Sequence, residues 1–356
     1  MVNKLLSVSE TLDLLTCPRK AWNDRQPIYE WLRTPDSISQ ALGSVLHLII
    51  EEIDSGRFDT IADDVIDSEI AERWKLLVTD AHNRLSRQTQ LGIVPPAERW
   101  PFYVLKCARA IDRAKMRRMH RSNSAVNLSP EIELTLESQR LGIRGRVDRV
   151  EFSGDLVRIV DHKSSTRPSG ATPHRYVLQL LIYCLLYESV HGIQPQSAAI
   201  EWLGGERESI PVTTELLEDT RNQIETARSH LDSDQVPRGI PSPEVCRFCH
   251  YRPVCDQYLE SDRYDWAGQP TFLVGSVLNN LESSSLVSLN LRVNSSHPGN
   301  ISTAALHGVL KNIAVREGDT VMADRLSWPR NVTNFDINWE TRMRVISQVP
   351  PDPGAI

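Results

Sequence analysis

The chain has 356 residues, a formal net charge of −6 at pH 7 and six cysteines. This length allows two domains and a sizeable core. The acidic balance argues against indiscriminate nucleic-acid binding, so any such contact must come from a local basic patch. The N-terminal sequence is too polar for a secretory signal, and no apolar run is long enough to span a bilayer. Together with the cysteine count, these features argue against a disulfide scaffold and predict a cytoplasmic protein without a membrane partner.

The first predicted helix covers residues 37–53. Its apolar residues recur at helical spacing and form a stripe that we expect to be buried. Gly43, His47 and Glu51 recur every four residues on another face of this helix. Gly43 would leave space for a phosphate or a metal to approach. His47 is therefore a candidate site residue, although a lone histidine in this pattern is also compatible with an ordinary surface side chain.

A mostly helical region continues to about residue 122, and its last part is strongly basic. Residues 99–121 hold eight Lys or Arg and one acid, Asp112. Four arginines spaced by four form a stripe along one helix: Arg109, Arg113, Arg117 and Arg121. The aromatic residues among them have rings on which bases can stack. The stripe is a candidate nucleic-acid contact, and the alternative is a solvated charged face.

Residues 131–163 are strand-like and contain a predicted β-hairpin. Two apolar-rich runs flank a Gly-Asp turn at residues 154–155. Folding about this turn places Asp148 almost opposite Asp161, with roughly 5 Å between opposed Cβ atoms. Asp161 and Lys163 are two residues apart, so they share one face of their strand. Two carboxylates and an ammonium therefore converge on a small patch.

Such a patch has the chemistry of a metal site. Carboxylates with open coordination positions suit Mg²⁺ or Mn²⁺. A metal held there can lower the pKa of a bound water and polarise a phosphoryl oxygen. For the hairpin taken alone, the alternative is a solvated salt bridge on the surface.

The next elements predict a second helix at the site. Residues 175–189 form a strongly apolar helix in which Gln179 and Tyr183 lie one turn apart. A strand at 198–203 and a polar helix at 213–232 follow.

The composition shifts near residue 262, and the remainder of the chain is predicted to be rich in short strands. The strand candidates are 271–277, 284–293, 309–315, 320–326 and 342–349. Their number favours a small barrel, with an OB-fold as the preferred interpretation. We therefore expect an α/β domain at 1–261 and a small β-rich domain at 262–356.

Four motifs, in their order and spacing, resemble the PD-(D/E)xK nuclease superfamily in its RecB-type branch. That branch carries Gly-x-x-x-His on a helix, then an aspartate, then Asp-x-Lys, and then Gln-x-x-x-Tyr on a helix. The matching residues are Gly43 and His47, Asp148, Asp161-His162-Lys163, and Gln179 with Tyr183. The resemblance covers about the first 260 residues. It implies an α/β, restriction-endonuclease-like core with a helical insertion that overhangs the active site and bears the arginine stripe.

The resemblance also implies a role for each motif residue. The metal ligands would be His47, Asp148, Asp161 and the backbone carbonyl of His162, whose side chain is expected to point away. Lys163 would orient the attacking water and stabilise charge in the transition state. Gln179 and Tyr183 would line the active site and help to hold the substrate strand, the alternative being a buried helix whose polar groups find local partners.

A cysteine cluster suggests a second bound group. Cys246, Cys249 and Cys255 leave a tetrahedral site one ligand short, and Cys17 is the natural fourth. One cysteine before the core and three after it resemble the arrangement in AddB nuclease domains and CRISPR-associated iron–sulfur nucleases. That resemblance implies a [4Fe–4S] cluster that ties together the two ends of the domain. The same thiolates could hold Zn²⁺ instead, with His250 as another possible fourth ligand.

These features predict a metal-dependent DNA nuclease that hydrolyses phosphodiester bonds with a metal-activated water. By resemblance, it would be an exonuclease on single-stranded or frayed DNA ends, acting in DNA repair, defence or CRISPR adaptation. A helicase or a CRISPR or defence complex would be its partner. One alternative is a catalytically idle DNA-binding or scaffold subunit of such a complex. Another is a structural protein in which the cysteines bind zinc and the hairpin resembles the nuclease motif by coincidence.

Overall fold

The backbone forms two compact units in the computed structural model. The structure describes residues 5–33, 36–89, 91–123, 130–231, 235–261, 266, 271–283, 286–297, 301–308, 313–327 and 333–346. The first unit comprises Met1–Leu15, Ile38–His82 and Pro96–Ser229. The second comprises Thr16–Ser37, Asn83–Pro95 and His230–Ile356. None of the described helices combines the length and apolar character needed to cross a membrane.

The first unit is built on a six-stranded mixed sheet, in which β2 pairs with β3 beside a path of five strands. The strands of that path are, in spatial order, β1 (Leu6–Ser7), β3 (Ile143–Ser153), β4 (Leu156–His162), β5 (Ser197–Glu201) and β6 (Arg207–Pro211). The sixth strand, β2, covers Glu131–Ser138. The β1–β3 and β4–β5 pairs are parallel, and the remaining pairs are antiparallel. The α/β class predicted from the sequence is confirmed.

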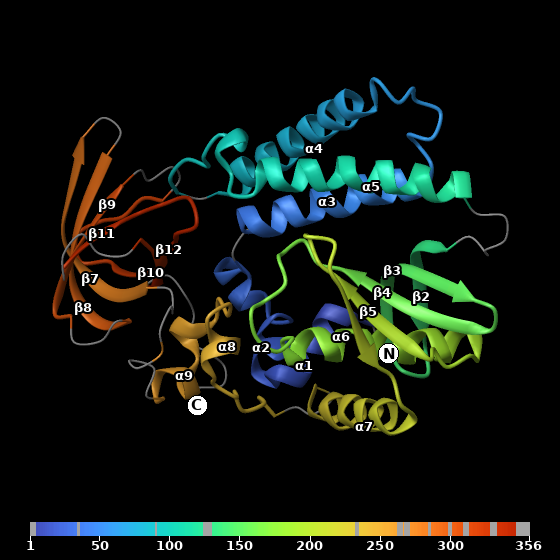
Figure 1. Ribbon diagram of the computed structural model, residues 1–356. Coiled ribbons are helices and arrows are strands. Elements are labelled where there is room, and N and C mark those ends of the chain that lie inside the picture. Colours follow the sequence, from blue (N-terminus) through green and yellow to red (C-terminus); the bar gives the residue numbers. More distant parts are fainter. Residues whose placement is uncertain are drawn as a thin grey trace. The chain divides into compact units, whose positions relative to one another are not determined.

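Helices pack on this sheet and beside one another. They are α1 (Val8–Thr16), α3 (Ile38–Asp54), α4 (Ile66–Gln88), α5 (Tyr103–Asn123), α6 (His174–His191) and α7 (Thr214–Leu231), with a short 3-10 turn at Ala97–Arg99. Helix α6 contacts β2, β3, β4 and β5, and its apolar residues form the core with the inner face of the sheet. Helices α3, α4 and α5 lie side by side (Figure 1).

The predicted hairpin is confirmed as the β3–β4 pair. Its two strands are antiparallel with Arg149 opposite Val160, and Gly154 in the turn has a φ of 59°. This left-handed conformation is one that glycine adopts without steric cost. Extending the register by one residue sets Asp148 opposite Asp161, as the sequence predicted. The helices predicted at 37–53, 175–189 and 213–232 are also confirmed, whereas strand β6 was not predicted because it is a short edge strand with little apolar character.

The second unit contains short helical segments and a second six-stranded sheet. The helical segments are α2 (Pro18–Asn23), η1 (Pro27–Leu32), α8 (Pro243–Cys246), η3 (Arg252–Val254) and α9 (Asp256–Leu259). In spatial order the strands are β11 (Asn334–Asp336), β9 (Thr303–Gly308), β8 (Leu286–His297), β7 (Thr271–Ser283), β10 (Thr320–Leu326) and β12 (Arg342–Val345).

The second sheet matches the predicted strands in part. Four candidates overlap β7, β8, β10 and β12, whereas β9 and β11 were not predicted. Of the candidate at 309–315, residues 309–312 lie outside the described part, and 313–315 form no strand. Among the described residues the pairing is an open path that ends at β11 and β12, so the expected OB-type barrel is not seen to close.

Candidate active site

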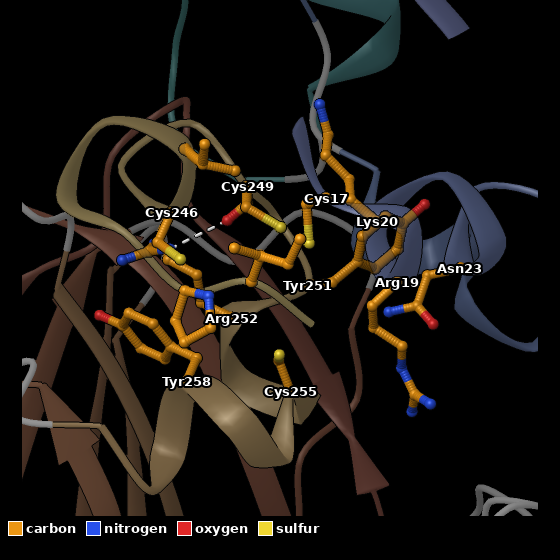
Figure 2. Close-up of a pocket in the computed structure, with 13 residues that line it drawn as sticks. Cys17, Arg19, Lys20, Asn23, Cys246, Cys249, Tyr251, Arg252, Cys255 and Tyr258 are labelled. Atoms are coloured by element: carbon orange, nitrogen blue, oxygen red, sulfur yellow. Dashed lines mark hydrogen bonds between the residues drawn. The ribbon is translucent and has the colours of Figure 1, made fainter. Parts of the chain in front are cut away.

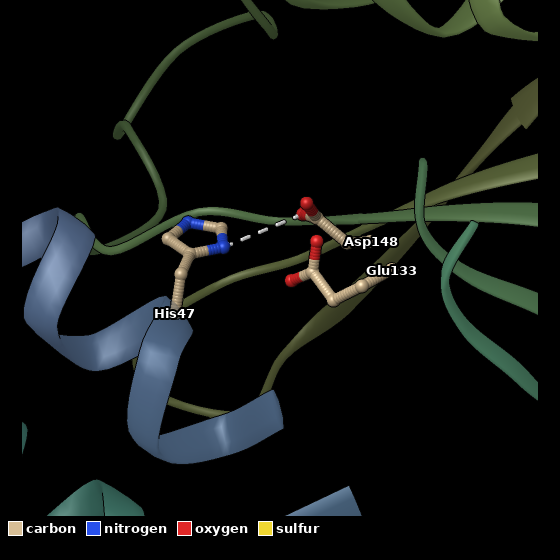
Figure 3. Close-up of side chains that lie close together, drawn as sticks. All are labelled: His47, Glu133 and Asp148. Atoms are coloured by element: carbon tan, nitrogen blue, oxygen red, sulfur yellow. Dashed lines mark ion pairs between the residues drawn. The ribbon is translucent and has the colours of Figure 1, made fainter. Parts of the chain in front are cut away.

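Three side chains that can bind a metal meet between helix α3 and the first sheet. His47 Nδ1 lies 3.7 Å from a carboxylate oxygen of Asp148. The ligand atoms of His47, Glu133 and Asp148 all lie within 4.8 Å of one another (Figure 3). Within the described ranges, this is the only group of three or more His, Cys, Asp or Glu residues that comes so close. The spacing allows one divalent ion, at about 2.0–2.5 Å from each ligand atom, to contact all three.

The electrostatics of this group favour a bound cation. Burial, and next the nearby charge of Asp161, raise the pKa of Asp148 well above its usual value. Burial also lowers the pKa of His47, which keeps a neutral ring nitrogen available as a ligand. A cation would stabilise the ionised form of Asp148 that burial disfavours. The donor set and its charge therefore fit a divalent metal.

The backbone of the hairpin holds Asp148 in place. The backbone N–H of His162 donates to Asp148 Oδ2 at 2.6 Å. Because side chains alternate along a strand, His162 faces away from Asp161 and Lys163. Its ring lies against Glu201, with Nδ1 3.8 Å from Oε2. His162 lines one pocket with His47, Lys163 and Glu201. Metal binding by its backbone carbonyl stays a prediction.

Lys163 connects the hairpin to helix α6. Its Nζ lies 2.7 Å from Asp161 Oδ2 and donates to Gln179 Oε1 at 2.6 Å. The same ammonium lies 4.4 Å from the centre of the Tyr176 ring. Tyr183, one turn after Gln179, has a raised pKa because of burial and then the nearby carboxylates, so its hydroxyl stays a proton donor. The four motifs that are separated in sequence therefore meet in one region.

Gly43 has a packing role that differs from the predicted one. A Cβ built on Gly43 would lie 2.8 Å from Ser164 Oγ. The glycine therefore lets helix α3 approach the segment that follows Lys163. We expected this glycine to leave space for a phosphate or a metal, and that expectation stays a prediction.

Glu133 was missed in the sequence. Strand β2 pairs with β3 so that Ile132 lies opposite Arg149 and Leu134 opposite Val147, which brings Glu133 next to Asp148. Burial raises the pKa of Glu133, although its ion pair with Arg146 opposes this. Its φ is 52°, which is uncommon for a residue other than glycine. The available signal was the acidic strand at residues 131–138, which could extend the hairpin to three strands. The hairpin alone, however, does not determine the register of that strand against β3.

The arginine stripe lies on α5 as predicted, and much of its charge is paired. Arg109 contacts Glu201 at 2.9 Å, Arg113 contacts both Asp54 and Glu201, and Arg117 contacts Asp59 at 3.1 Å. The side chain of Arg121 lies outside the described residues. These pairs give the stripe a structural role that the sequence did not reveal, and its contact with DNA stays a prediction.

The aromatic residues near the stripe are in different environments. Trp100 is buried and Tyr103 packs edge-on against Trp74, with 5.8 Å between ring centres. Phe102 is 60% exposed. Of these three aromatic rings, only that of Phe102 is largely open to a stacking partner.

The four predicted cysteine ligands line a single pocket in the second unit. Figure 2 shows the sulfur atoms of Cys17, Cys246, Cys249 and Cys255 directed toward the same space. Burial raises the pKa of Cys246 to about 11 and that of Cys249 to about 12. His250 is not among the lining residues, and its Nε2 lies 3.6 Å from Asp24.

Four cysteine thiols that line one space are a donor set that suits a [4Fe–4S] cluster as well as a tetrahedral zinc ion. Binding of either group stays a prediction.

Comparisons with known proteins agree with the α/β unit and its acidic, lysine-containing site. A model of the PD-(D/E)XK nuclease superfamily matches residues 5–256, and the chain belongs to this superfamily. It is also 25% identical, over 171 residues, to the CRISPR-associated exonuclease Cas4 of Francisella tularensis subsp. novicida (strain U112). That match covers 48% of this chain and 84% of the relative. The resemblance inferred from the motifs is confirmed, and both matches support a nuclease.

Two solved structures show weaker similarity. The protein SSO0001 is 13% identical, with a TM-score of 0.26, and the match covers 61% of this chain and 98% of that chain. A protein from Eubacterium rectale is also 13% identical, with a TM-score of 0.35, and the match covers 64% of this chain and 80% of that chain. These scores are too low to support a detailed comparison.

Proposed function

We propose that this chain is a metal-dependent nuclease that hydrolyses phosphodiester bonds in DNA. The observation that carries the proposal is the convergence of His47, Glu133 and Asp148 beside the Asp161–Lys163 pair. Carboxylate oxygens with one imidazole suit Mn²⁺, and carboxylate oxygens with open positions suit Mg²⁺. Superfamily membership independently favours hydrolysis of a phosphodiester.

The proposed ligands come from helix α3, strand β2 and the β3–β4 hairpin. They are His47, Asp148, Asp161 and the backbone carbonyl of His162, with Glu133 as an additional ligand. A bound Mg²⁺ or Mn²⁺ would supply an acidified water and polarise a phosphoryl oxygen. The His162 N–H orients the Asp148 carboxylate through the 2.6 Å hydrogen bond between them.

Lys163, Gln179 and Tyr183 have separate tasks in this proposal. Gln179 accepts a hydrogen bond from the Lys163 ammonium at 2.6 Å and so fixes its position. The ammonium stabilises negative charge that develops on the phosphoryl oxygens. Tyr183 keeps its proton, because its pKa is raised by burial, and can donate a hydrogen bond to the substrate strand.

The substrate and setting follow from the relative and the motifs. The matched relative is named a CRISPR-associated exonuclease. We extend this to the chain as exonuclease activity on single-stranded or frayed DNA ends. Repair, defence or CRISPR adaptation is the proposed setting, with a helicase or a CRISPR or defence complex as partner. Within this proposal, residues 1–261 form the nuclease domain and 262–356 a separate β-rich domain.

A [4Fe–4S] cluster is the proposed second cofactor, held by Cys17, Cys246, Cys249 and Cys255. It would connect the N-terminal cysteine to the segment that follows the nuclease core. The position of one cysteine before the nuclease core and three after it supports a cluster over Zn²⁺, because this arrangement resembles that of iron–sulfur nucleases. Anaerobic purification with iron and zinc analysis tests the assignment, and stoichiometric zinc without iron would replace the cluster by a zinc site.

The decisive test of the function is digestion of end-labelled single- and double-stranded DNA in Mn²⁺ by protein purified without oxygen. The expected result is metal-dependent shortening from the ends, most rapid on single strands. The Asp161→Ala variant, prepared in parallel, controls for contaminating nucleases. DNA binding without cleavage by the wild type would favour the idle DNA-binding or scaffold subunit instead.

A further inference from the structure

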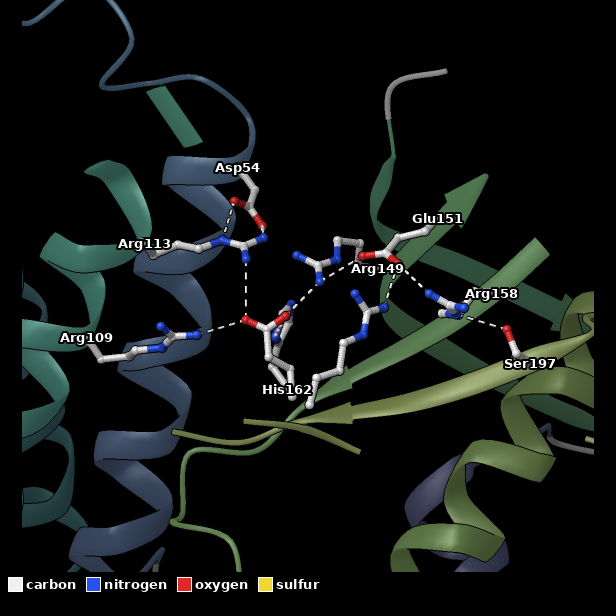
Figure 4. Close-up of polar contacts among 10 residues, drawn as sticks. Asp54, Arg109, Arg113, Arg149, Glu151, Arg158, His162 and Ser197 are labelled. Carbon is white, nitrogen blue, oxygen red and sulfur yellow. Dashed lines mark hydrogen bonds and ion pairs between the residues drawn. The ribbon is translucent and has the colours of Figure 1, made fainter. Parts of the chain in front are cut away.

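A buried network of ion pairs lies next to the candidate metal site, between helix α5 and the sheet. Glu201, at the end of β5, accepts hydrogen bonds from Arg109 at 2.9 Å, Arg113 at 3.3 Å and Arg149 at 2.7 Å (Figure 4). Burial alone would raise the pKa of Glu201. The three arginines outweigh that effect and hold the pKa below its usual value. Glu201 is therefore a buried, ionised centre around which cations are arranged.

Arg113 connects this centre to helix α3. Its Nε and Nη2 donate to the two carboxylate oxygens of Asp54 at 2.9 and 2.6 Å, and its Nη1 donates to Glu201. The side chain of Arg113 is 16% exposed and that of Asp54 only 4%. A planar guanidinium can bond two carboxylates at once, whereas the compact ammonium of lysine lacks this fixed fork.

One of the two carboxylates lies on the helix that carries His47, and the other lies on β5, which pairs with the hairpin strand β4. Asp54 is the last residue of α3, two helical turns after His47, so both lie on one side of that helix. Glu201 pairs with His162 in the parallel β4–β5 register, and its carbonyl accepts from the Lys163 N–H at 2.8 Å. Arg113 therefore joins the helix that bears His47 to β5, the strand that pairs with the Asp161-bearing strand β4.

We propose that Arg113 is a positioning residue that sets the distance between His47 and the carboxylates of the hairpin. This proposal rests on the proposed metal site. It gives Arg113 a role different from the DNA contact that the stripe suggested. Supporting contacts of this kind typically change metal affinity by about 10- to 100-fold when they are removed.

Arg117 provides a matched control. It lies one turn further along α5 and also forms a two-pronged pair, with both Nε and Nη2 3.1 Å from Asp59. Asp59 follows α3 in the chain, and neither of these two hydrogen bonds involves Glu201. Loss of Arg117 therefore removes a similar ion pair, between α5 and the segment that follows α3. It leaves intact the hydrogen bond from Arg113 to Glu201 on the sheet.

The test measures Mn²⁺ binding by titration calorimetry and, separately, the melting temperature of the metal-free protein. We expect Arg113→Gln to weaken Mn²⁺ binding about 10-fold or more, and Arg117→Gln to leave it within about twofold of the wild type. Arg113→Lys should weaken binding in the same direction, because lysine keeps the charge but not the two-sided geometry. If Arg113→Gln does not fold, Arg113→Lys takes its place.

Three results separate the possible explanations. Equal Mn²⁺ affinity for wild type and the Arg113 variants would overturn the positioning role, even if both arginine variants melt at lower temperature. Equal weakening by the Arg113 and Arg117 variants would show a general effect of stability and would also overturn it. If His47→Ala binds Mn²⁺ as tightly as the wild type, the proposed metal site itself is wrong.

A DNA-binding measurement completes the test. For a positioning residue, the Arg113→Gln variant should keep the wild-type dependence of DNA affinity on salt when measured without divalent metal. Each lost phosphate contact lowers the log–log salt slope by about 1. A slope reduced in this way, with unchanged Mn²⁺ affinity, would assign Arg113 to the DNA interface instead.

Discussion

Substitution of Asp324 should destabilise the second unit more than most single changes. Asp324, on β10, accepts a hydrogen bond from Arg252 at 2.8 Å, and the two side chains are 3% and 1% exposed. Arg252 also donates to the carbonyl of Cys249 at 2.9 Å. Asp324→Asn would leave a buried guanidinium without its counter-charge, and such a loss typically costs about 3–5 kcal/mol.

The assay is denaturant unfolding under anaerobic conditions, with Asp67→Asn as the control. Asp67 pairs with Lys115 at 2.7 Å, but both side chains are about half exposed. Exposed pairs contribute about 0–1 kcal/mol, so the control should unfold close to the wild type. A loss below about 1 kcal/mol for Asp324→Asn would refute the reasoning. The double variant Asp324→Asn with Arg252→Met should recover part of the loss, because it removes the buried cation as well.

Three further predictions concern the sites. Asp161→Ala should abolish cleavage while DNA binding persists, because loss of a shared metal removes several kcal/mol of transition-state stabilisation; near-wild-type activity would contradict the assignment. The pKa of Asp148 is raised in the folded, metal-free chain, so its contribution to stability falls as pH rises from about 3.8 through the raised pKa. Asp148→Asn should therefore raise the melting temperature in EDTA at pH 7. A lower melting temperature for this variant would argue against a destabilising buried charge on Asp148. Cys17→Ser should give colourless, poorly soluble protein, whereas Cys107→Ser should stay brown; equal iron content in the two would exclude Cys17 as a ligand.

The hairpin could be predicted because its determinants are local. A Gly-Asp turn and two alternating runs fix the register of β3 and β4, and this register places Asp148 opposite Asp161. The apolar helix that carries Gln179 and Tyr183 was equally clear from its composition and length. In both cases, neighbouring residues alone determine which side chains share a face.

The roles of Glu133 and Arg113 depend on contacts between distant segments. The register of β2 against β3 depends on a connection around Gly142 and on a residue with positive φ, neither of which periodicity reveals. The arginine spacing on α5 was predicted correctly, but the acidic partner Asp54 lies 59 residues away in sequence and Glu201 lies 88 residues away. Sequence pattern therefore identified a cationic face without showing that carboxylates of the same unit already neutralise much of it.

The close packing of Gly43 against Ser164 also affects the thermodynamics of ion binding. Helix α3 meets the rest of its unit near Gly43 at one end and through Asp54 and Arg113 at the other. These two attachments lie about 16 Å apart along the helix axis, at 1.5 Å per residue, and His47 lies between them. A helix held at both ends has little freedom to rock, so the histidine is ordered during folding rather than during ion binding. Little entropy should then be lost from the protein when the ion arrives, and ion release should leave the imidazole in place for the next one.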